Sequence, residues 1–246
     1  MNIKTTRAIQ PQCGFTLVEM AVVLVIIGLI TAALLVPLQA QRQQVDLTQT
    51  ENTLAIAQKA LLGFAQSQGR LPCPATATSS GAEAPLGGTT CTQPVGFLPA
   101  ATLGIQPTDS QGFALDAWNN RIRYAVTASN AGGAASPDFT TSNDMSTVTM
   151  AALTPDLRVC GSSSPASCSA TSYLINNAVA VIYSTGPTGA LGSGGADEDE
   201  NLNNGTVFVS HPPNATGAAN GEFDHLVVWI SPYVLYNAMV EAGQLH

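Results

Sequence analysis

The segment that decides the fold is GFTLVEMAVVLVIIGLITAALLVPL, which occupies residues 14–38. It carries a single charged side chain, Glu19, and the next charge along the chain is Arg42. The 23 residues at positions 15–37 would form a helix roughly 34 Å long at about 1.5 Å per residue, and the apolar core of a bilayer is about 30 Å thick. We therefore expect a helix that can cross a membrane. A carboxylate inside such a helix costs about 2.5–3.5 kcal/mol at its centre, so Glu19 is expected to need a partner.

The residues at the start of this segment resemble the class III signal of type IV pilins and type II secretion pseudopilins. Gly14 is followed by Phe15, Glu19 is the fifth residue after the glycine, and the run beyond it is uninterrupted and apolar. In that family a prepilin peptidase cuts after the glycine and methylates the new amino terminus. The resemblance implies cleavage between Gly14 and Phe15, and a contact of Glu19 with the amino terminus of a neighbouring subunit during filament assembly. A buried carboxylate and a buried ammonium can offset each other's desolvation.

Two other export signals fit the sequence less well. An ordinary secretory signal has a basic start, an apolar stretch of about 7–15 residues and a small-residue cleavage site after it. Lys4 and Arg7 could supply the basic start, but the apolar run is longer, and a cut after Ala40 would place Leu38 where a small residue is preferred. A lipoprotein signal is excluded because Cys13 precedes the apolar run.

The charge of the chain disfavours some partners. Of 246 residues only 10% are charged, and 8 basic residues face 16 acidic ones. Removal of a leader that contains Lys4 and Arg7 would leave 6 basic residues and change the net charge from −8 to −10. A chain this acidic repels nucleic acid and anionic lipid, which argues against a DNA-receptor role, so we expect no nucleic acid as a partner.

The cysteines are consistent with export. Five cysteines are present, and removal of Cys13 with the leader would leave four: Cys73, Cys91, Cys160 and Cys168. Four cysteines can pair fully in an oxidising periplasm. Proximity in the sequence favours Cys73–Cys91 and Cys160–Cys168, although four cysteines allow three connectivities. Free or metal-binding thiols are the alternative.

The expected fold class is α+β and pilin-like, with a long amino-terminal helix packed on a roughly four-stranded antiparallel sheet, long disulfide-stapled loops and a short carboxy-terminal helix. The chain divides into a leader at 1–14, a membrane or filament-core helix at 15–38, an amphipathic continuation at 39–69 and a periplasmic globular head at 70–246.

The elements of the head are predicted from local patterns. Turn-forming residues at 116–120 precede a strand, and Ser231 followed by Pro232 is a good helix start. We expect the rest of 70–111 to be irregular and a short strand near 147–151. The sheet strands are predicted at 121–127, 178–184, 206–210 and 226–231.

One loop of the head has the composition of a cation site. The run GSGGADEDE at residues 192–200 is glycine-rich and then acidic, and calcium takes six to eight oxygen ligands. The loop loosely resembles the calcium loop of major pseudopilins, but the ligand positions of that family do not transfer to it. The candidate calcium ligands are its own acidic side chains Asp197, Asp199 and Glu200. A solvated acidic loop without metal is the alternative.

No catalytic motif is recognised. His211, His225 and His246 share no ligand spacing, and His225 beside Asp224 is interpreted as a surface pair. We expect no enzymatic activity and no certain cofactor.

The sequence as a whole favours a minor pseudopilin-like structural subunit of a type II secretion machine, or of a related type IV filament. Its expected partners are prepilin peptidase, other pilin or pseudopilin subunits and the inner membrane, with the amino terminus cytoplasmic before processing and the head periplasmic. The alternatives are a type IV pilus minor pilin in adhesion, motility or DNA uptake, and a membrane-tethered calcium-binding adhesin that does not polymerise. A soluble secreted hydrolase cut after Ala40 is a further alternative.

Overall fold

The computed structural model describes residues 14–131, 136–148, 150–164, 168, 173–192 and 194–245. The chain forms two units, Met1–Val45 and Asp46–His246, and each is described by itself. The predicted leader apart from Gly14 lies outside the described residues, and so does His246.

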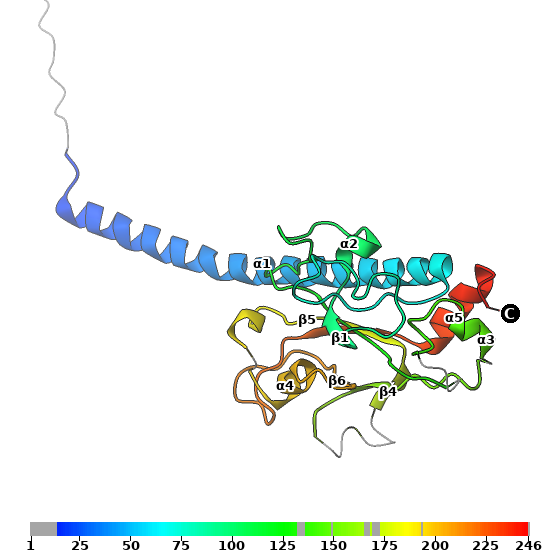
Figure 1. The fold of residues 1–246 in the computed structure, drawn as a ribbon. Helices are drawn as coiled ribbons and strands as arrows, with labels where there is room; N and C mark the ends of the chain where they lie inside the picture. The colour runs from blue at the N-terminus through cyan, green and yellow to red at the C-terminus, as the bar shows by residue number, and fades with distance from the viewer. Residues whose placement is uncertain are drawn as a thin grey trace, which may run out of the picture. The chain divides into compact units, whose positions relative to one another are not determined.

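The first helix, α1, runs from Leu17 to Gln68 without a break in its 52 residues, so the two predicted helical segments are one element (Figure 1). Its side chains are exposed from residue 17 to residue 32, and most of them are apolar. Among the described residues, the structure has no helix with an apolar stretch long enough to cross a membrane. The membrane-crossing role of the segment therefore stays a prediction.

The head contains two sheets that pack against each other. The first sheet has the order β1-β2-β5-β7 and is antiparallel throughout. Its strands are β1 (Val95–Phe97), β2 (Arg123–Val126), β5 (Ala180–Ser184) and β7 (Leu226–Ile230). The second sheet has the order β4-β3-β6, with β3 antiparallel to β4 and parallel to β6. Its strands are β3 (Leu157–Cys160), β4 (Tyr173–Ala178) and β6 (Val207–Val209).

Short helices connect and cover these strands. They are α2 (Ala100–Leu103), α3 (Asp144–Thr147), the 3₁₀ turn η1 (Gly189–Leu191), α4 (Ala196–Leu202) and α5 (Pro232–Glu241). The predicted start of the last helix is confirmed, because Ser231 Oγ accepts a hydrogen bond from Val234 N and Pro232 occupies the first turn.

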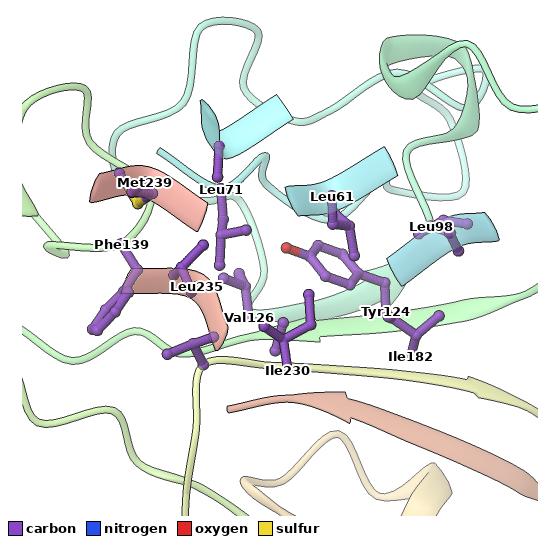
Figure 2. Packing of buried hydrophobic residues seen from close by; sticks show 14 of the residues in the cluster. Leu61, Leu71, Leu98, Tyr124, Val126, Phe139, Ile182, Ile230, Leu235 and Met239 are labelled. Atoms are coloured by element: carbon purple, nitrogen blue, oxygen red, sulfur yellow. The ribbon is translucent and has the colours of Figure 1, made fainter. Parts of the chain in front are cut away.

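The main core lies between the part of α1 in the head and one face of the first sheet. Leu54, Ala57, Leu61 and Ala65 recur every three or four residues and are buried, which is the spacing of one helix face. They belong to one cluster with side chains of β2, β5 and β7, and α5 adds Leu235 and Met239 (Figure 2). One face of α1 at residues 54–65 is therefore buried in the head.

A second core lies on the opposite face of the first sheet. Val181 and Tyr183 of β5 pack with Leu157, Val159 and Phe208 of the second sheet. All five residues of β5 are buried, since this strand has a core on each of its two faces. The head thus has three layers: α1, the first sheet and the second sheet (Figure 1).

Three sequence-based expectations about the head are wrong in detail. The strand expected at 206–210 is present as β6, but it pairs with β3 in the second sheet. Its place in the first sheet is taken by β1, which arises in a region expected to be irregular. Around the strand expected at 147–151 the structure has the helical turn α3 and then turns, with residue 149 outside the described part. These pairings join segments far apart in the chain, so local patterns do not reveal them.

Candidate functional site

The predicted cleavage point lies just before the first turn of α1. Gly14 and Phe15 are not helical, and both are exposed. The Phe15 side chain is 84% exposed, and nothing lies within 4 Å of the position that a Cβ on Gly14 would take. The bond between these residues is therefore accessible in the structure, as a protease substrate must be.

Glu19 caps the amino terminus of α1. Thr16 N donates to Glu19 Oε2 at 2.8 Å, and Glu19 N donates to Thr16 Oγ1 at 3.2 Å. This reciprocal pair is a capping box, in which a threonine and the glutamate three residues later satisfy two backbone donors that the helix leaves free. The sequence pattern Thr16-x-x-Glu19 contains this signal, but the sequence analysis did not use it. The carboxylate that the pilin-type signal requires is thus also the group that begins the helix.

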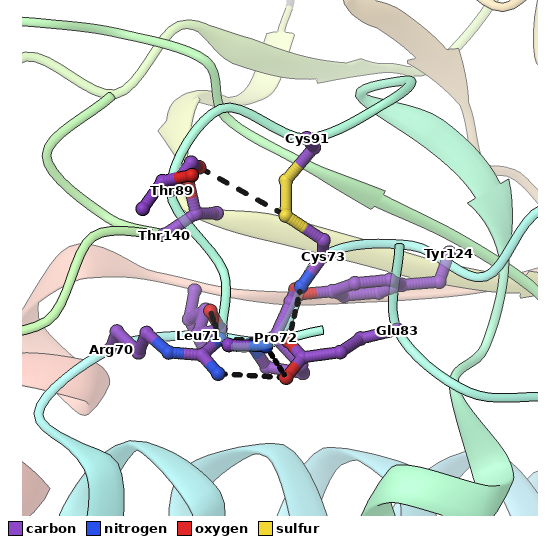
Figure 3. Close-up of a disulfide and its surroundings, with 10 residues drawn as sticks. Arg70, Leu71, Pro72, Cys73, Glu83, Thr89, Cys91, Tyr124 and Thr140 are labelled. Carbon is purple, nitrogen blue, oxygen red and sulfur yellow. Dashed lines mark hydrogen bonds and ion pairs between the residues drawn. A yellow bond between two sulfur atoms is a disulfide. The ribbon is translucent and has the colours of Figure 1, made fainter. Parts of the chain in front are cut away.

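A disulfide closes the long loop that follows α1. Cys73 and Cys91 are bonded, with their Cα atoms 5.3 Å apart, and the loop that this bond closes contains Glu83, which forms a buried ion pair with Arg70 (Figure 3). Arg70 Nη1 and Nη2 donate to the two carboxylate oxygens of Glu83 at 2.8 and 2.7 Å. Glu83 also accepts hydrogen bonds from the backbone N–H groups of Cys73 and Gly87. The loop is therefore fixed by one covalent bond and one carboxylate.

The second disulfide joins Cys160 at the end of β3 to Cys168. The structure thus contains both pairings that sequence proximity favours. The loop that begins at Cys160 approaches the acidic segment, because Ser162 Oγ and Ser163 N both donate to Asp197 Oδ1, at 3.2 and 2.5 Å.

The three candidate calcium ligands lie in different environments. Asp197 is buried, whereas Asp199 is exposed and Glu200 is half-buried. All three are in α4, where Asp197 and Asp199 are two positions apart and do not face each other, whereas Asp197 and Glu200 are three apart and lie on one side. Calcium binding by these residues stays a prediction.

The Asp197 carboxylate is bonded by groups of the protein itself. Besides the two serines it accepts from Asn220 Nδ2, and His211 Nε2 lies 3.2 Å from its Oδ2. Burial raises the pKa of the Asp197 carboxyl, but the hydrogen bonds of Ser163, Asn220 and His211 outweigh burial and hold this pKa below its usual value. Asp197 therefore links α4 to the loop after Cys160 and to the loop that contains His211 and Asn220.

A buried cluster beside this segment was missed by the sequence analysis. Glu198, Asp224 and His225 each place one possible metal-ligand atom within 4.8 Å of the others. The interpretation of Asp224 and His225 as a surface pair is wrong, since His225 is only 3% exposed and Asp224 only 9%. Phe223, Asp224 and His225 are consecutive and all buried, and no local pattern of the sequence shows that α4 covers this segment.

The polar atoms of this cluster are only partly paired. Glu198 accepts from the backbone N–H groups of Gly194 and Asp224, and Asp224 Oδ2 accepts from both the N–H and the hydroxyl of Thr188. Asp224 Oδ1 and His225 Nε2 are buried without a hydrogen-bond partner among the described residues. Burial and the Glu198 charge raise the pKa of Asp224.

The tautomer of His225 decides whether the cluster suits a metal ion. Asn201 Oδ1 accepts from Val209 N, and Asn201 Nδ2 donates to Val209 O, so the orientation of this amide is fixed. Its second N–H points at His225 Nδ1, 3.1 Å away, which makes Nδ1 an acceptor and leaves the ring proton on Nε2. A ligating histidine instead donates its other N–H to an acceptor. The present geometry therefore does not fit His225 as a metal ligand.

Comparison with known proteins identifies the amino-terminal segment. Residues 9–35 match the family model described as the prokaryotic N-terminal methylation motif, so the chain carries the type IV pilin and pseudopilin signal. The matched region ends within α1 and does not include the head. None of the curated proteins and none of the solved structures with which the chain was compared matches it.

Proposed function

We propose that this protein is a structural subunit of a type IV filament, and specifically a minor pseudopilin of a type II secretion machine. The observation that carries the proposal is the methylation motif at residues 9–35 on a chain whose α1 continues from that motif into a compact head. Prepilin-type processing and pilin-like assembly follow from the motif in general. The specific machine and the specific role are the proposal.

The proposed mechanism is structural. Prepilin peptidase cuts between Gly14 and Phe15 and methylates the Phe15 amine, and the apolar part of α1 inserts into the inner membrane. Its side chains at residues 17–32 are exposed and mostly apolar, which supports burial in lipid or against other helices. Glu19 leaves its contact with Thr16 and binds the amino terminus of a neighbouring subunit. There the attraction between the two opposite charges offsets the cost of removing both from water.

The size and shape of the head support a minor subunit. Its first loop occupies most of residues 70–94 and needs a disulfide and a buried ion pair to fix it. Loops this long without secondary structure are uncommon and often carry recognition. A head with such individual features suits a subunit present in few copies that contacts neighbours or cargo. No catalytic role is proposed.

Mass spectrometry of the chain purified from membranes tests the class. The expected result is a mature amino terminus at N-methyl-Phe15, and a start at residue 41 would instead indicate a secretory signal cut after Ala40. A Glu19→Ala variant should still be cut and should lose co-purification with other filament subunits. If the variant assembles as well as the unchanged chain, assembly through Glu19 is wrong.

Gene deletion tests the machine. Loss of protein secretion with normal twitching motility is expected for a pseudopilin. Loss of twitching with normal secretion would assign the chain to a type IV pilus instead.

A further inference from the structure

Arg123 of the head forms no ion pair with a carboxylate of the described residues. Six basic residues follow the leader: Arg42, Lys59, Arg70, Arg121, Arg123 and Arg158. Arg70 pairs with Glu83 and Arg121 pairs with Asp109, each at 2.7 Å. Every acidic residue of the chain is among the described residues, and none of them forms an ion pair with Arg123.

The guanidinium of Arg123 is nevertheless held in place. Arg123 is the first residue of β2. Its Nη2 donates to Asn204 Oδ1 at 2.9 Å, its Nε lies 3.4 Å from Tyr183 Oη, and its Cζ lies 5.1 Å from the centre of the Phe97 ring. A guanidinium has five N–H donors, and these two hydrogen bonds leave three of them for a ligand. A charge that is already positioned loses little conformational freedom when it binds.

The arginine lines a cavity of about 370 Å³ that contains no acidic side chain. Gln93 and Asn204 add two side-chain amides to it, and Phe97 adds an apolar wall. Gly96 gives the Gln93 amide room, because a Cβ at position 96 would lie 2.5 Å from Gln93 Nε2. Asn204 has a positive φ of 60°, a conformation that asparagine tolerates better than most residues. The cavity therefore offers one cation and several amide donors.

We propose that this cavity binds an aspartate or glutamate side chain of a neighbouring filament subunit. A carboxylate accepts two parallel hydrogen bonds from an arginine, and a single negative charge is balanced by the single guanidinium. A phosphate group carries nearly two negative charges at neutral pH and would leave one uncompensated. The apolar wall of Phe97 suits the methylene groups of an acidic side chain. This proposal rests on the proposed filament function, which supplies the neighbouring subunit.

Photo-crosslinking in cells that assemble the filament tests the proposal. A photoreactive residue is introduced at Ala77, which lines the same cavity and is exposed. The expected result is a crosslink to another subunit through a peptide that contains an aspartate or glutamate. Arg123→Gln should reduce its yield about tenfold, the loss expected when one charge pair of about 1.4 kcal/mol is removed.

The matched control is Arg158→Gln, which removes the same charge from an exposed position on the second sheet. It should leave the crosslink unchanged, and neither variant should shift the melting temperature by more than a few degrees. Arg123→Glu combined with a lysine in place of the captured acid should restore the yield. An unchanged yield in Arg123→Gln, or a captured peptide without an acidic residue, overturns the proposal.

The cavity's ligand and the filament function can be tested separately. If Glu19→Ala abolishes the crosslink and Arg123→Gln leaves it intact, filament assembly stands and the cavity proposal is wrong. If the mature chain does not begin at Phe15, the filament function itself is wrong.

Discussion

Asn201 Nδ2 donates a hydrogen bond to His225 Nδ1 across 3.1 Å, and this contact fixes the protonation of a buried histidine. Asn201 is itself fully buried and anchored on both backbone groups of Val209. Nδ1 can accept this bond only while it is unprotonated. Burial lowers the pKa of His225 to about 4, although the Asp224 carboxylate acts in the opposite direction.

The stability of the head should therefore depend on pH through His225. The unfolded ring has a pKa of about 6.5, so between that value and about 4 the unfolded chain binds a proton that the folded chain does not. The contribution of the uncharged His225 ring to the free energy of unfolding is fully present above about pH 6.5. It is lost as the pH falls toward 4, with a total loss of about 3 kcal/mol.

The test is denaturant unfolding of the full chain in detergent at several pH values from 7.5 to 4.5. His225→Gln cannot take up this proton, so its free energy of unfolding should fall less steeply than that of the unchanged chain. Equal slopes for the two proteins would show that the ring does not titrate in this way.

The Arg70–Glu83 ion pair should contribute strongly to the stability of the first loop. Both side chains are about 95% buried, and removal of one partner leaves the other charge buried and unpaired. Glu83→Gln is expected to destabilise the head by about 3–5 kcal/mol. A double variant, Arg70→Met with Glu83→Leu, should recover part of this loss. If the double variant is as unstable as the sum of the two single variants, the pair is not coupled.

The same pair predicts an effect of acid. Burial raises the pKa of Glu83. The hydrogen bonds and charge of Arg70 and the two backbone donors lower this pKa by more than burial raises it, so the net shift is downward. The stabilisation is present above the unfolded pKa of about 4.3 and is lost as the pH falls through the lower folded value. In thermal melts below pH 4.3, the unchanged chain should lose stability while Glu83→Gln loses less.

The two disulfides should differ in their contribution to stability. Their cysteines are 18 and 8 residues apart, and the entropy of loop closure gives about 3 and about 2.5 kcal/mol respectively. Replacement of Cys73 and Cys91 by serine should also loosen the loop that contains Glu83. Hydrogen exchange should then increase at residues 74–91 and remain unchanged in β3. An increase limited to β3 would contradict this assignment.

Asp197 and Asp199 provide a matched test of the acidic segment. Asp197→Ala removes the acceptor of several hydrogen bonds from partly buried donors, which is expected to cost about 1–3 kcal/mol in all. Asp199→Ala changes an exposed side chain and should alter stability by less than about 0.5 kcal/mol. Melting temperatures measured with calcium and with a chelator separate the two roles. A calcium-dependent shift that both variants abolish would establish shared ligation.

Much of the fold could be predicted because its signals are local. The apolar run after Gly14, the buried face of α1 and the Ser231–Pro232 helix start each lie within a few turns of chain. The turn at residues 116–120 is of the same kind, since Asp116 Oδ1 accepts from the N–H groups of Trp118 and Asn120. Short-range hydrogen bonds and helix periodicity follow directly from residue type and spacing.

The second sheet and the buried acidic cluster could not be predicted in this way. β6 has three residues and becomes a strand by pairing with β3, which lies about 50 positions earlier in the chain. Glutamate is a residue type that is almost never fully buried and histidine is intermediate, and Glu198 and His225 are buried where α4 contacts residues 224–225 just before β7. The position of Arg123 beside Asn204 also depends on segments 81 residues apart.

The sequence alone thus determined that this chain carries a prepilin-type signal and where its long helix lies, because such signals and helices are encoded within one continuous stretch. The tertiary structure decided which charges are buried, which are paired and which remain available, because burial depends on segments that meet only after folding. Glu19 shows both: its spacing from Gly14 is a property of the sequence, and its bond to Thr16 is a property of the folded helix.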